Sequence, residues 1–221
     1  MDRTYIETQL LEACRRLAGK GFFNAPANGF SLRVPGTMEM ILATGVEDWS
    51  QIAIAHLQTA SLLAQEGSSG LHASIYQERP DVGAIAISSP KGARLLARHG
   101  GRLPPLFDEL VRHIGSSVGP LPDVEKAHRD LVRKTFRGGA NAALLGERLL
   151  CLGMTCERVL FNTELYEKCA QCYVIARASG NRIGFIPVWV RLIANRRLLG
   201  DERRAAASYR IGQIPEGISA Y

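Results

Sequence analysis

The chain has 221 residues, of which 46 % are hydrophobic and 22 % are charged, a composition that fits one or two globular domains and excludes disordered and fibrous proteins. The formal net charge is +6, but eight arginines and only three acidic residues lie between residues 177 and 221. The first 176 residues are nearly neutral, with 19 basic and 18 acidic side chains. This distribution predicts no nucleic-acid partner, although it leaves open a local anion-binding or partner-binding role for the C-terminal segment.

No stretch of the sequence reaches the roughly 18 to 20 apolar residues of a membrane-spanning helix, and the first residues lack the apolar core of a signal peptide. We therefore expect a cytoplasmic protein without a membrane partner. The five cysteines are an odd number, which predicts reduced thiols rather than a disulfide framework. Cys169 and Cys172 form a C-x-x-C inside a helical pattern, and we expect both thiols to be buried on a helix face.

Apolar periodicity and turn residues predict the secondary structure along the chain. Helical periodicity predicts helices over 4–18, 71–79, 90–99, 123–136 and 155–179, and two weaker helices over 187–197 and 201–209. Alternating or short apolar runs predict strands over 30–34, 38–43, 82–87, 142–145 and 149–152. Two ranges are less defined: 48–64 fits either one helix or a short helix followed by a strand, and 103–122 is a mixed connection rich in Pro and Gly.

The order of these elements predicts a single α/β domain over residues 1–221. Helices flank a sheet that contains the hairpin of residues 30–43, so the sheet is at least partly antiparallel. We interpret residues 180–221 as an Arg-rich helical extension of the same domain. The sequence contains no Walker loop, dinucleotide-binding glycine motif, HExxH or nucleophile-elbow motif, and its five histidines lack the spacing of a metal site. Local motifs alone therefore predict only the fold class.

An ordered set of motifs resembles the class II aldolase/adducin family from about residue 1 to residue 179. The segment Asn28-Gly-Phe-Ser-Leu-Arg33 resembles the family's Gly-Asn-x-Ser-x-Arg with Gly and Asn in reversed order, and Ala43-Thr-Gly-Val46 resembles its Thr-Pro-x-Gly turn. The most specific block, Gly70-Leu-His-Ala-Ser-Ile-Tyr-Gln-Glu-Arg-Pro-Asp-Val82, is similar to Leu-His-x-x-Ile-Tyr-x-x-Arg-Pro-Asp-Val. Asn141–Leu145 and Glu164–Gln171 resemble the family's late strand and long helix.

The resemblance implies a three-layer α/β/α domain with a central, mainly antiparallel sheet. It also implies four-fold homotetramers whose pockets lie at subunit interfaces. Members hold a divalent metal, usually zinc, with two histidines of a His-x-His-Pro and a third in a His-Gly after the late strand. In the family, a glutamate just before the Leu-His helix does the acid–base work, and the metal stabilises an enediolate.

This sequence departs from the family pattern at each of these positions. The His-x-His-Pro position reads Ile87-Ser88-Ser89-Pro90, the His-Gly position reads Arg148-Leu149, and the glutamate position falls at Ser68 or Ser69. Isoleucine cannot ligate a metal, serine is a poor zinc ligand, and Arg148 places a fixed positive charge where the metal would sit. We therefore predict that the pocket holds no metal and no other cofactor.

The altered pocket predicts an atypical, metal-independent family member. We expect a lyase-type enzyme of carbohydrate metabolism, of the aldolase, decarboxylase or dehydratase kind, that acts on a small anionic carbonyl or hydroxy-acid substrate. Arg148 would replace the charge of the metal and bind a carboxylate, phosphate or enolate oxygen. The acid–base candidates are Glu147, Asp108, Glu109 and His113, although Glu147 and Arg148 could instead form only a salt bridge in a hairpin turn. The substrate-binding candidates are Asn28, Thr44, Gly45, Ser68, Ser69, His72, Ser88 and Ser89, of which His72 could be purely structural.

An alternative interpretation is a catalytically inactive pseudoenzyme. Adducin heads resemble the same fold without working as aldolases, so the scaffold can serve assembly. The basic C-terminal segment would then be the surface that binds a partner. Its arginines are Arg191, Arg196, Arg197, Arg203, Arg204 and Arg210.

Overall fold

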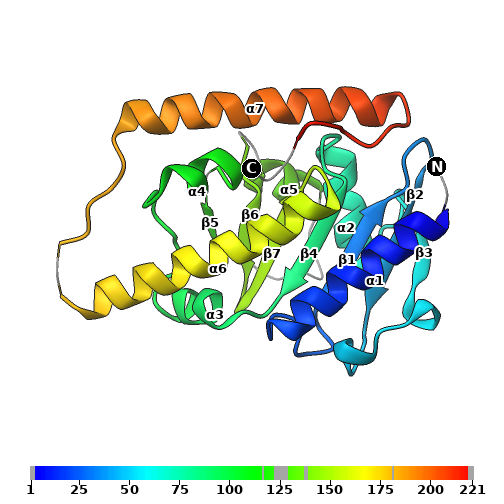
Figure 1. Cartoon of the computed structure of the whole chain (residues 1–221), viewed down its shortest axis with the longest axis horizontal. Helices are drawn as coiled ribbons and strands as arrows, with labels where there is room; N and C mark the ends of the chain where they lie inside the picture. The colour runs from blue at the N-terminus through cyan, green and yellow to red at the C-terminus, as the bar shows by residue number, and fades with distance from the viewer. Residues whose placement is uncertain (1–2, 116, 122–128, 137–138, 181, 219–221) are drawn as a thin grey trace.

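The computed structural model describes residues 3–115, 117–121, 129–136, 139–180 and 182–218 of the chain (Figure 1). Within these residues one seven-stranded sheet has the order β3-β2-β1-β4-β7-β6-β5. The strands are β1 (Gly29–Arg33), β2 (Glu39–Thr44), β3 (Gln58–Ser61), β4 (Ala84–Ser88), β5 (Ser117–Leu121), β6 (Ala142–Leu145) and β7 (Arg148–Gly153). Neighbouring strands pair antiparallel except β5 and β6, which are parallel. The mainly antiparallel sheet is therefore confirmed.

Helices cover both faces of the sheet and make it the middle of three layers (Figure 1). The helices are α1 (Arg3–Gly19), α2 (Gly67–Glu78), α3 (Lys91–Arg98), α4 (Asp108–His113), α5 (Arg129–Thr135), α6 (Cys156–Ala178) and α7 (Val188–Arg210), with short 3-10 turns at Trp49–Gln51 and Ile54–His56. Successive strand residues point to opposite faces. In β4, Ala84 and Ala86 join the core formed with α1, α3 and α6, whereas Ile85 and Ile87 join the core formed with α2.

The C-terminal helix corrects one sequence-based expectation. Residues 187–197 and 201–209 do not form two weaker helices, because α7 runs as one helix of 23 residues through Gly200. Its inward face is continuous across that glycine, with Ala194, Leu198 and Ala205 buried. Space around Gly200 is open, so the glycine costs the helix only about 1 kcal/mol relative to alanine, and the packed face outweighs it.

Three further expectations are refined by the structure. Residues 48–64 adopt short helical turns followed by β3, which is the second of the two alternatives. The mixed connection contains α4 and β5, and the helix expected over 123–136 is described only as α5, because residues 122–128 lie outside the described part. All five cysteines are free, but only Cys169 of the C-x-x-C is buried, whereas Cys172 is exposed. Among the described residues, no helix is long and apolar enough to cross a membrane.

Candidate functional site

The start of β1, the end of β2, the end of β4 and the start of β7 lie at the same end of the sheet. Antiparallel pairing places Gly29 at the start of β1 beside Thr44 at the end of β2 and Ile87 near the end of β4. It also places Ser88 beside Leu149, directly after Arg148 at the start of β7. The register thus gathers predicted site residues that are far apart in the sequence. We call this region, with Asn28, Thr44, Ser88, Ser89 and Arg148, the Arg148 edge.

Hydrogen bonds of Asn28 fix the loop before β1 against β4. Its Nδ2 donates to Ser89 Oγ over 3.1 Å and to the main-chain oxygens of Phe22 and Ile87 over 3.3 and 3.4 Å. Its Oδ1 accepts a bond of 2.9 Å from the amide of Ala25. Asn28 is 1 % exposed, so its amide organises the edge from within rather than facing solvent.

Thr44 and Gly45 lie at the end of β2, but one amide of this turn is already used. The N–H of Gly45 donates to the main-chain oxygen of Pro26 over 3.2 Å, and Gly45 has a φ of +70°, which favours glycine. Thr44 is half-buried beside Gly29. The turn therefore braces the Asn28 loop, and its Gly45 amide is not a free anion donor.

Arg148 is anchored by one hydrogen bond and carries no ion pair within the described residues. Its Nη1 donates to the main-chain oxygen of Ala27 over 2.8 Å. Glu147 does not form the hairpin salt bridge with Arg148, because it binds Arg98 of α3 over 2.7 and 3.0 Å and lies 3.6 Å from Arg94. The bond from Arg98 lowers the pKa of Glu147 below its usual value. The positive charge of Arg148 is thus left without a carboxylate partner in the described structure.

Ser88 and Ser89 are both hydrogen-bonded, and of the two only Ser89 stands where the family resemblance implies a histidine. Ser88 Oγ donates to Leu149 O over 3.5 Å, and Ser89 Oγ accepts from Asn28. Ser69 Oγ donates to Glu66 O over 3.1 Å at the start of α2. Ser68 is the second residue of the same helix, and its side chain lies outside the described part of the structure.

His72 forms a buried network that sequence reasoning recognised only in part. Its Nδ1 lies 2.6 Å from Ser31 Oγ, which lies 2.9 Å from Tyr76 Oη, and Tyr76 Oη donates to Ser31 O over 3.1 Å. Burial lowers the pKa of His72 to about 4, so the ring is neutral. The network is satisfied if Nδ1 carries the proton, which leaves a lone pair on Nε2.

The Nε2 atom of His72 faces the start of β1 and has no hydrogen-bond partner in the described structure. A Cβ at Gly29 would lie 3.8 Å from it and only 3.0 Å from Thr44 Cγ2. Glycine at position 29 therefore avoids a tight contact with the Thr44 side chain of the neighbouring strand, whereas the contact with His72 would be an ordinary one. Ser31 and Tyr76 were missed, although Tyr76 follows His72 by one helical turn and so lies on the same face of α2.

The remaining acid–base candidates lie on α4, away from these contacts. The His113 ring contacts Arg158 and packs edge-on against Phe161, with ring centroids 4.9 Å apart. His113 O accepts a bond from Asn141, just before β6, which is the opposite end of that strand from the Arg148 turn. Asp108 and Glu109 are exposed in the first turn of α4, which packs against α6 and α7. Within one chain, Glu147 therefore lies next to Arg148 in the sequence, whereas the candidates on α4 lie away from the Arg148 edge.

The Arg148 edge does not fit a zinc ion. The side chain of Ile87 has no donor atom, both serine hydroxyls are hydrogen-bonded, and Arg148 carries a guanidinium at the position where the family resemblance implies the third ligand. Zinc sites in proteins use thiolates, imidazoles and carboxylates. No group of three or more such side chains is close enough to hold a metal anywhere in the described residues.

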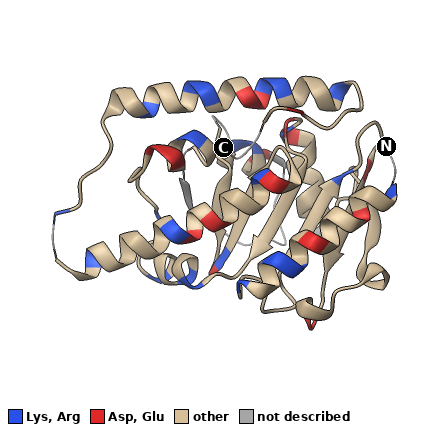
Figure 2. Cartoon of the chain, in the orientation of Figure 1, with Lys and Arg blue, Asp and Glu red and all other residues tan. Residues whose placement is uncertain are grey.

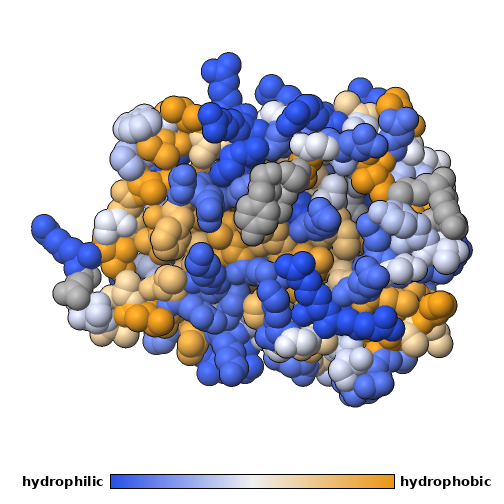
Figure 3. Space-filling view, viewed as in Figure 1, coloured by the Kyte–Doolittle hydropathy of each residue, from blue (hydrophilic) through white to orange (hydrophobic). Residues whose placement is uncertain are grey.

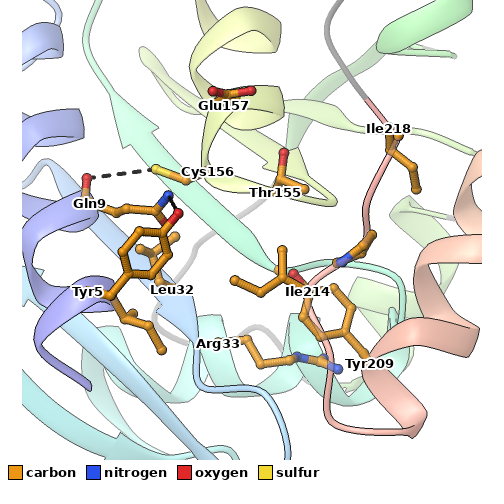
Figure 4. A pocket seen from close by; sticks show the side chains of 14 residues that line it. Tyr5, Gln9, Leu32, Arg33, Thr155, Cys156, Glu157, Tyr209, Ile214 and Ile218 are labelled. Atoms are coloured by element: carbon orange, nitrogen blue, oxygen red, sulfur yellow. Dashed lines mark hydrogen bonds between the residues drawn. The ribbon is translucent and has the colours of Figure 1, made fainter. Parts of the chain in front are cut away.

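A cavity of about 300 Å³ lies at the other end of β1 from the Arg148 edge and was not predicted (Figure 4). Figure 4 shows Tyr5 and Gln9 of α1 on one side of it, Thr155 and Cys156 above, and Arg33 and Tyr209 below. Burial raises the pKa of the Cys156 thiol to about 12, so its thiolate is not available as a nucleophile. Both ends of the chain line this cavity, and no sequence motif joins them.

Comparisons with known proteins agree with the fold. A family model described as Class II Aldolase and Adducin N-terminal domain matches residues 8–174. The methylthioribulose-1-phosphate dehydratase of Pectobacterium carotovorum is 23 % identical over 187 residues, which cover 75 % of this chain and 91 % of that protein. L-fuculose 1-phosphate aldolase from Glaciozyma antarctica shares 17 % identity with a TM-score of 0.72, over 95 % of this chain and 90 % of that one. The L-fuculose-1-phosphate aldolase of Thermus thermophilus shares 22 % identity with a TM-score of 0.68, over 81 % of this chain and 99 % of that one.

Proposed function

Because the chain belongs to the class II aldolase and adducin family, we propose that it is a lyase-type enzyme that works at the Arg148 edge without a metal ion. The proposed substrate is a small anionic carbonyl or hydroxy-acid compound of carbohydrate metabolism. Relatives named as a dehydratase and as aldolases of phosphorylated sugars support this reaction class. We further propose that the enzyme is a cytoplasmic homotetramer whose pockets lie at subunit interfaces.

The observation that carries the proposal is the state of Arg148. Its guanidinium is held by Ala27 O at a strand end, and no described carboxylate neutralises it. A planar, always charged group of this kind binds carboxylate or phosphate oxygens through two parallel hydrogen bonds. The edge therefore offers a fixed positive charge at the position where the family resemblance implies a metal.

The chemistry of the edge follows from this charge. Arg148 would bind the substrate anion or stabilise the enolate oxygen that develops next to it, which is electrostatic stabilisation by a pre-oriented donor. Asn28 would keep Ser89 and the preceding loop in place. Glu147, adjacent to Arg148, would move the proton, while Arg98 and Arg94 keep it ionised as a base.

The remaining candidates have more limited roles in this proposal. Ser69 would line the pocket, and Thr44 would border it at the end of β2. Ser88 is fully buried and would support the edge from the interior. His72 would support the edge from the interior through Ser31 and Tyr76. Asp108, Glu109 and His113 have no described contact with the edge within one chain, so any contribution from them would come across a subunit boundary.

A panel of small anions tests the proposal. The purified chain, treated with a chelator and then freed of it, is given pyruvate, lactate, glycolate, inorganic phosphate and dihydroxyacetone phosphate, and binding and turnover are measured. We expect binding and turnover within the panel to be unchanged by chelation. Loss of activity on chelation with full recovery on adding zinc would contradict metal independence.

A second candidate, the catalytically inactive scaffold, is favoured by one observation. The outward face of α7 carries Arg196, Arg197, Arg203 and Arg210, which are exposed and without ion pairs among the described residues. Absence of both binding and turnover across the whole panel would favour this candidate over the enzyme.

A further inference from the structure

The first half of α7 presents apolar side chains outward. Val188, Trp189, Leu192 and Ile193 are 60 %, 65 %, 66 % and 50 % exposed, and their spacing places all four on one side of the helix. We call them the α7 stripe. Figure 3 shows hydrophobic side chains at the upper left of the molecule, where Figure 1 places the first half of α7. Contiguous exposed apolar surface of this kind marks an interaction site.

A groove of about 610 Å³ runs beside the stripe. Val188 and Leu192 form one wall, and Leu103, Pro105 and Val111 belong to the other. A ridge and a groove therefore lie next to each other on one face. Under a two-fold rotation such a face is self-complementary, because the ridge of one copy meets the groove of the other.

Charges of both signs flank the stripe. Asp108 and Glu109 are exposed at the start of α4, and Arg196 and Arg197 are exposed one turn beyond the stripe. None of these four side chains takes part in an ion pair within the described residues. Figure 2 shows the acidic first turn of α4 and the basic positions along α7 on the same side of the molecule.

Helices α4 and α7 run in the same direction. The acidic residues of α4 and the arginines of α7 therefore lie at opposite ends of the stripe. The amide of Ile186 donates to Pro105 O over 3.2 Å, whereas Gly115 lies beside Leu198. The acidic turn is therefore level with the first part of the stripe, and the arginines follow its end. An antiparallel copy would bring the arginines of each chain toward the acidic turn of the other.

We propose that this face is a two-fold interface with a second copy of this chain. A membrane with anionic headgroups or an acidic partner segment would meet the unpaired carboxylates of Asp108 and Glu109, which repel it, whereas a second copy matches both signs of charge. Burying Trp189 and Leu192 would supply the apolar centre of the contact. The proposal does not depend on the lyase activity, because it concerns only the association of chains. The contact is two-fold, so it is distinct from the interfaces of the four-fold homotetramer proposed above and would join two such tetramers.

The oligomeric mass of the full chain tests the proposal. Sedimentation velocity and light scattering are run on the wild type, on Trp189→Glu and on Ile54→Glu, a matched control that is 63 % exposed on another part of the surface. We expect the wild type and the control to share one mass and Trp189→Glu to show half of it, with self-association at least about 30-fold weaker. A monomeric wild type, an unchanged mass in Trp189→Glu, or a fall to one quarter of the mass would overturn the two-fold interface.

A second pair of variants, which reverses the charges at positions 108 and 196, tests the interface even if Trp189→Glu does not fold. Asp108→Arg alone should weaken self-association, and adding Arg196→Asp in the same chain should restore it, because each copy then presents the reversed pair. Circular dichroism checks that both variants fold. A double variant as weak as the single one would contradict the proposed pairing.

Discussion

The guanidinium of Arg148 donates to the main-chain oxygen of Ala27, 121 residues earlier in the chain, over 2.8 Å. This bond joins the start of β7 to the loop that precedes β1. It holds a positive charge in a fixed place, and the edge around it contains Ile87 and Ser89, at the positions where the family resemblance implies histidines. The edge and the buried networks that support it can each be tested by substitution.

Replacing Asn28 with alanine should destabilise the fold and weaken anion binding together. The substitution leaves the main-chain oxygens of Phe22 and Ile87 without their side-chain donor in the interior, which costs about 2–3 kcal/mol. Asn24→Ala is the matched control, because Asn24 is exposed in the same loop, and its loss should cost less than about 1 kcal/mol. Urea unfolding of both variants measures the difference. Equal costs would contradict the internal role of Asn28.

The buried imidazole of His72 should make stability depend on pH. Its pKa is about 4 in the folded chain, whereas the ordinary pKa of a histidine is 6.5, so the unfolded chain binds more protons between these values. Stability is therefore fully present above pH 6.5 and falls as the pH drops, by about 2 kcal/mol between pH 7 and pH 5. Unfolding of the wild type and of His72→Gln at both pH values measures this contribution.

The control for His72 is His56→Gln, at an exposed histidine. Its pH dependence should match that of the wild type, whereas His72→Gln should lose about 2 kcal/mol of the difference between pH 7 and pH 5. If the stability of His72→Gln depends on pH as strongly as that of the wild type, another group titrates between pH 5 and pH 7.

Arg79→Met should be strongly destabilising because it leaves two carboxylates unpaired. Arg79 binds Asp81 through two bonds of 2.8 and 2.7 Å and Glu202 of α7 over 2.9 Å, and it is 8 % exposed. Removing one partner of a buried ion pair costs about 3–5 kcal/mol. Arg98→Met is the matched control, since Arg98 also makes two bonds to one carboxylate but is exposed, and its loss should change stability far less than Arg79→Met. Similar melting temperatures of the two variants would contradict this account.

Much of the fold was predictable from local signals. The β1–β2 hairpin follows from the Pro35-Gly36 turn, where Gly36 has a φ of +75°, and the β6–β7 pair follows from the turn at Gly146. β5 was not predicted, because it contains Pro120 and pairs only at the edge of the sheet, where proline is tolerated. The continuity of α7 was missed because Gly200 interrupts the pattern, although the buried face on either side does not change.

The candidate site residues are a prediction from motifs, and their arrangement in space could not be predicted from the sequence. Family-like motifs located Asn28, Ser89 and Arg148, and strand register brings them together. The alternative in which Glu147 pairs with Arg148 was wrong, because its partner Arg98 lies 49 residues earlier on α3 and no sequence spacing connects the two. The separation of α4 from the Arg148 edge depends on tertiary packing against α6 and α7, which local patterns do not encode.

Anion affinity at Arg148 tests the central claim most directly. Isothermal titration with pyruvate and with inorganic phosphate compares the wild type, Arg148→Ala, Arg148→Lys and the control Arg203→Ala, which removes an exposed arginine of α7. We predict that Arg148→Ala weakens binding of at least one anion by roughly 10- to 100-fold, that Arg148→Lys retains part of it, and that Arg203→Ala leaves it unchanged. Affinities that are the same in Arg148→Ala and in the wild type would contradict an anion site at this edge.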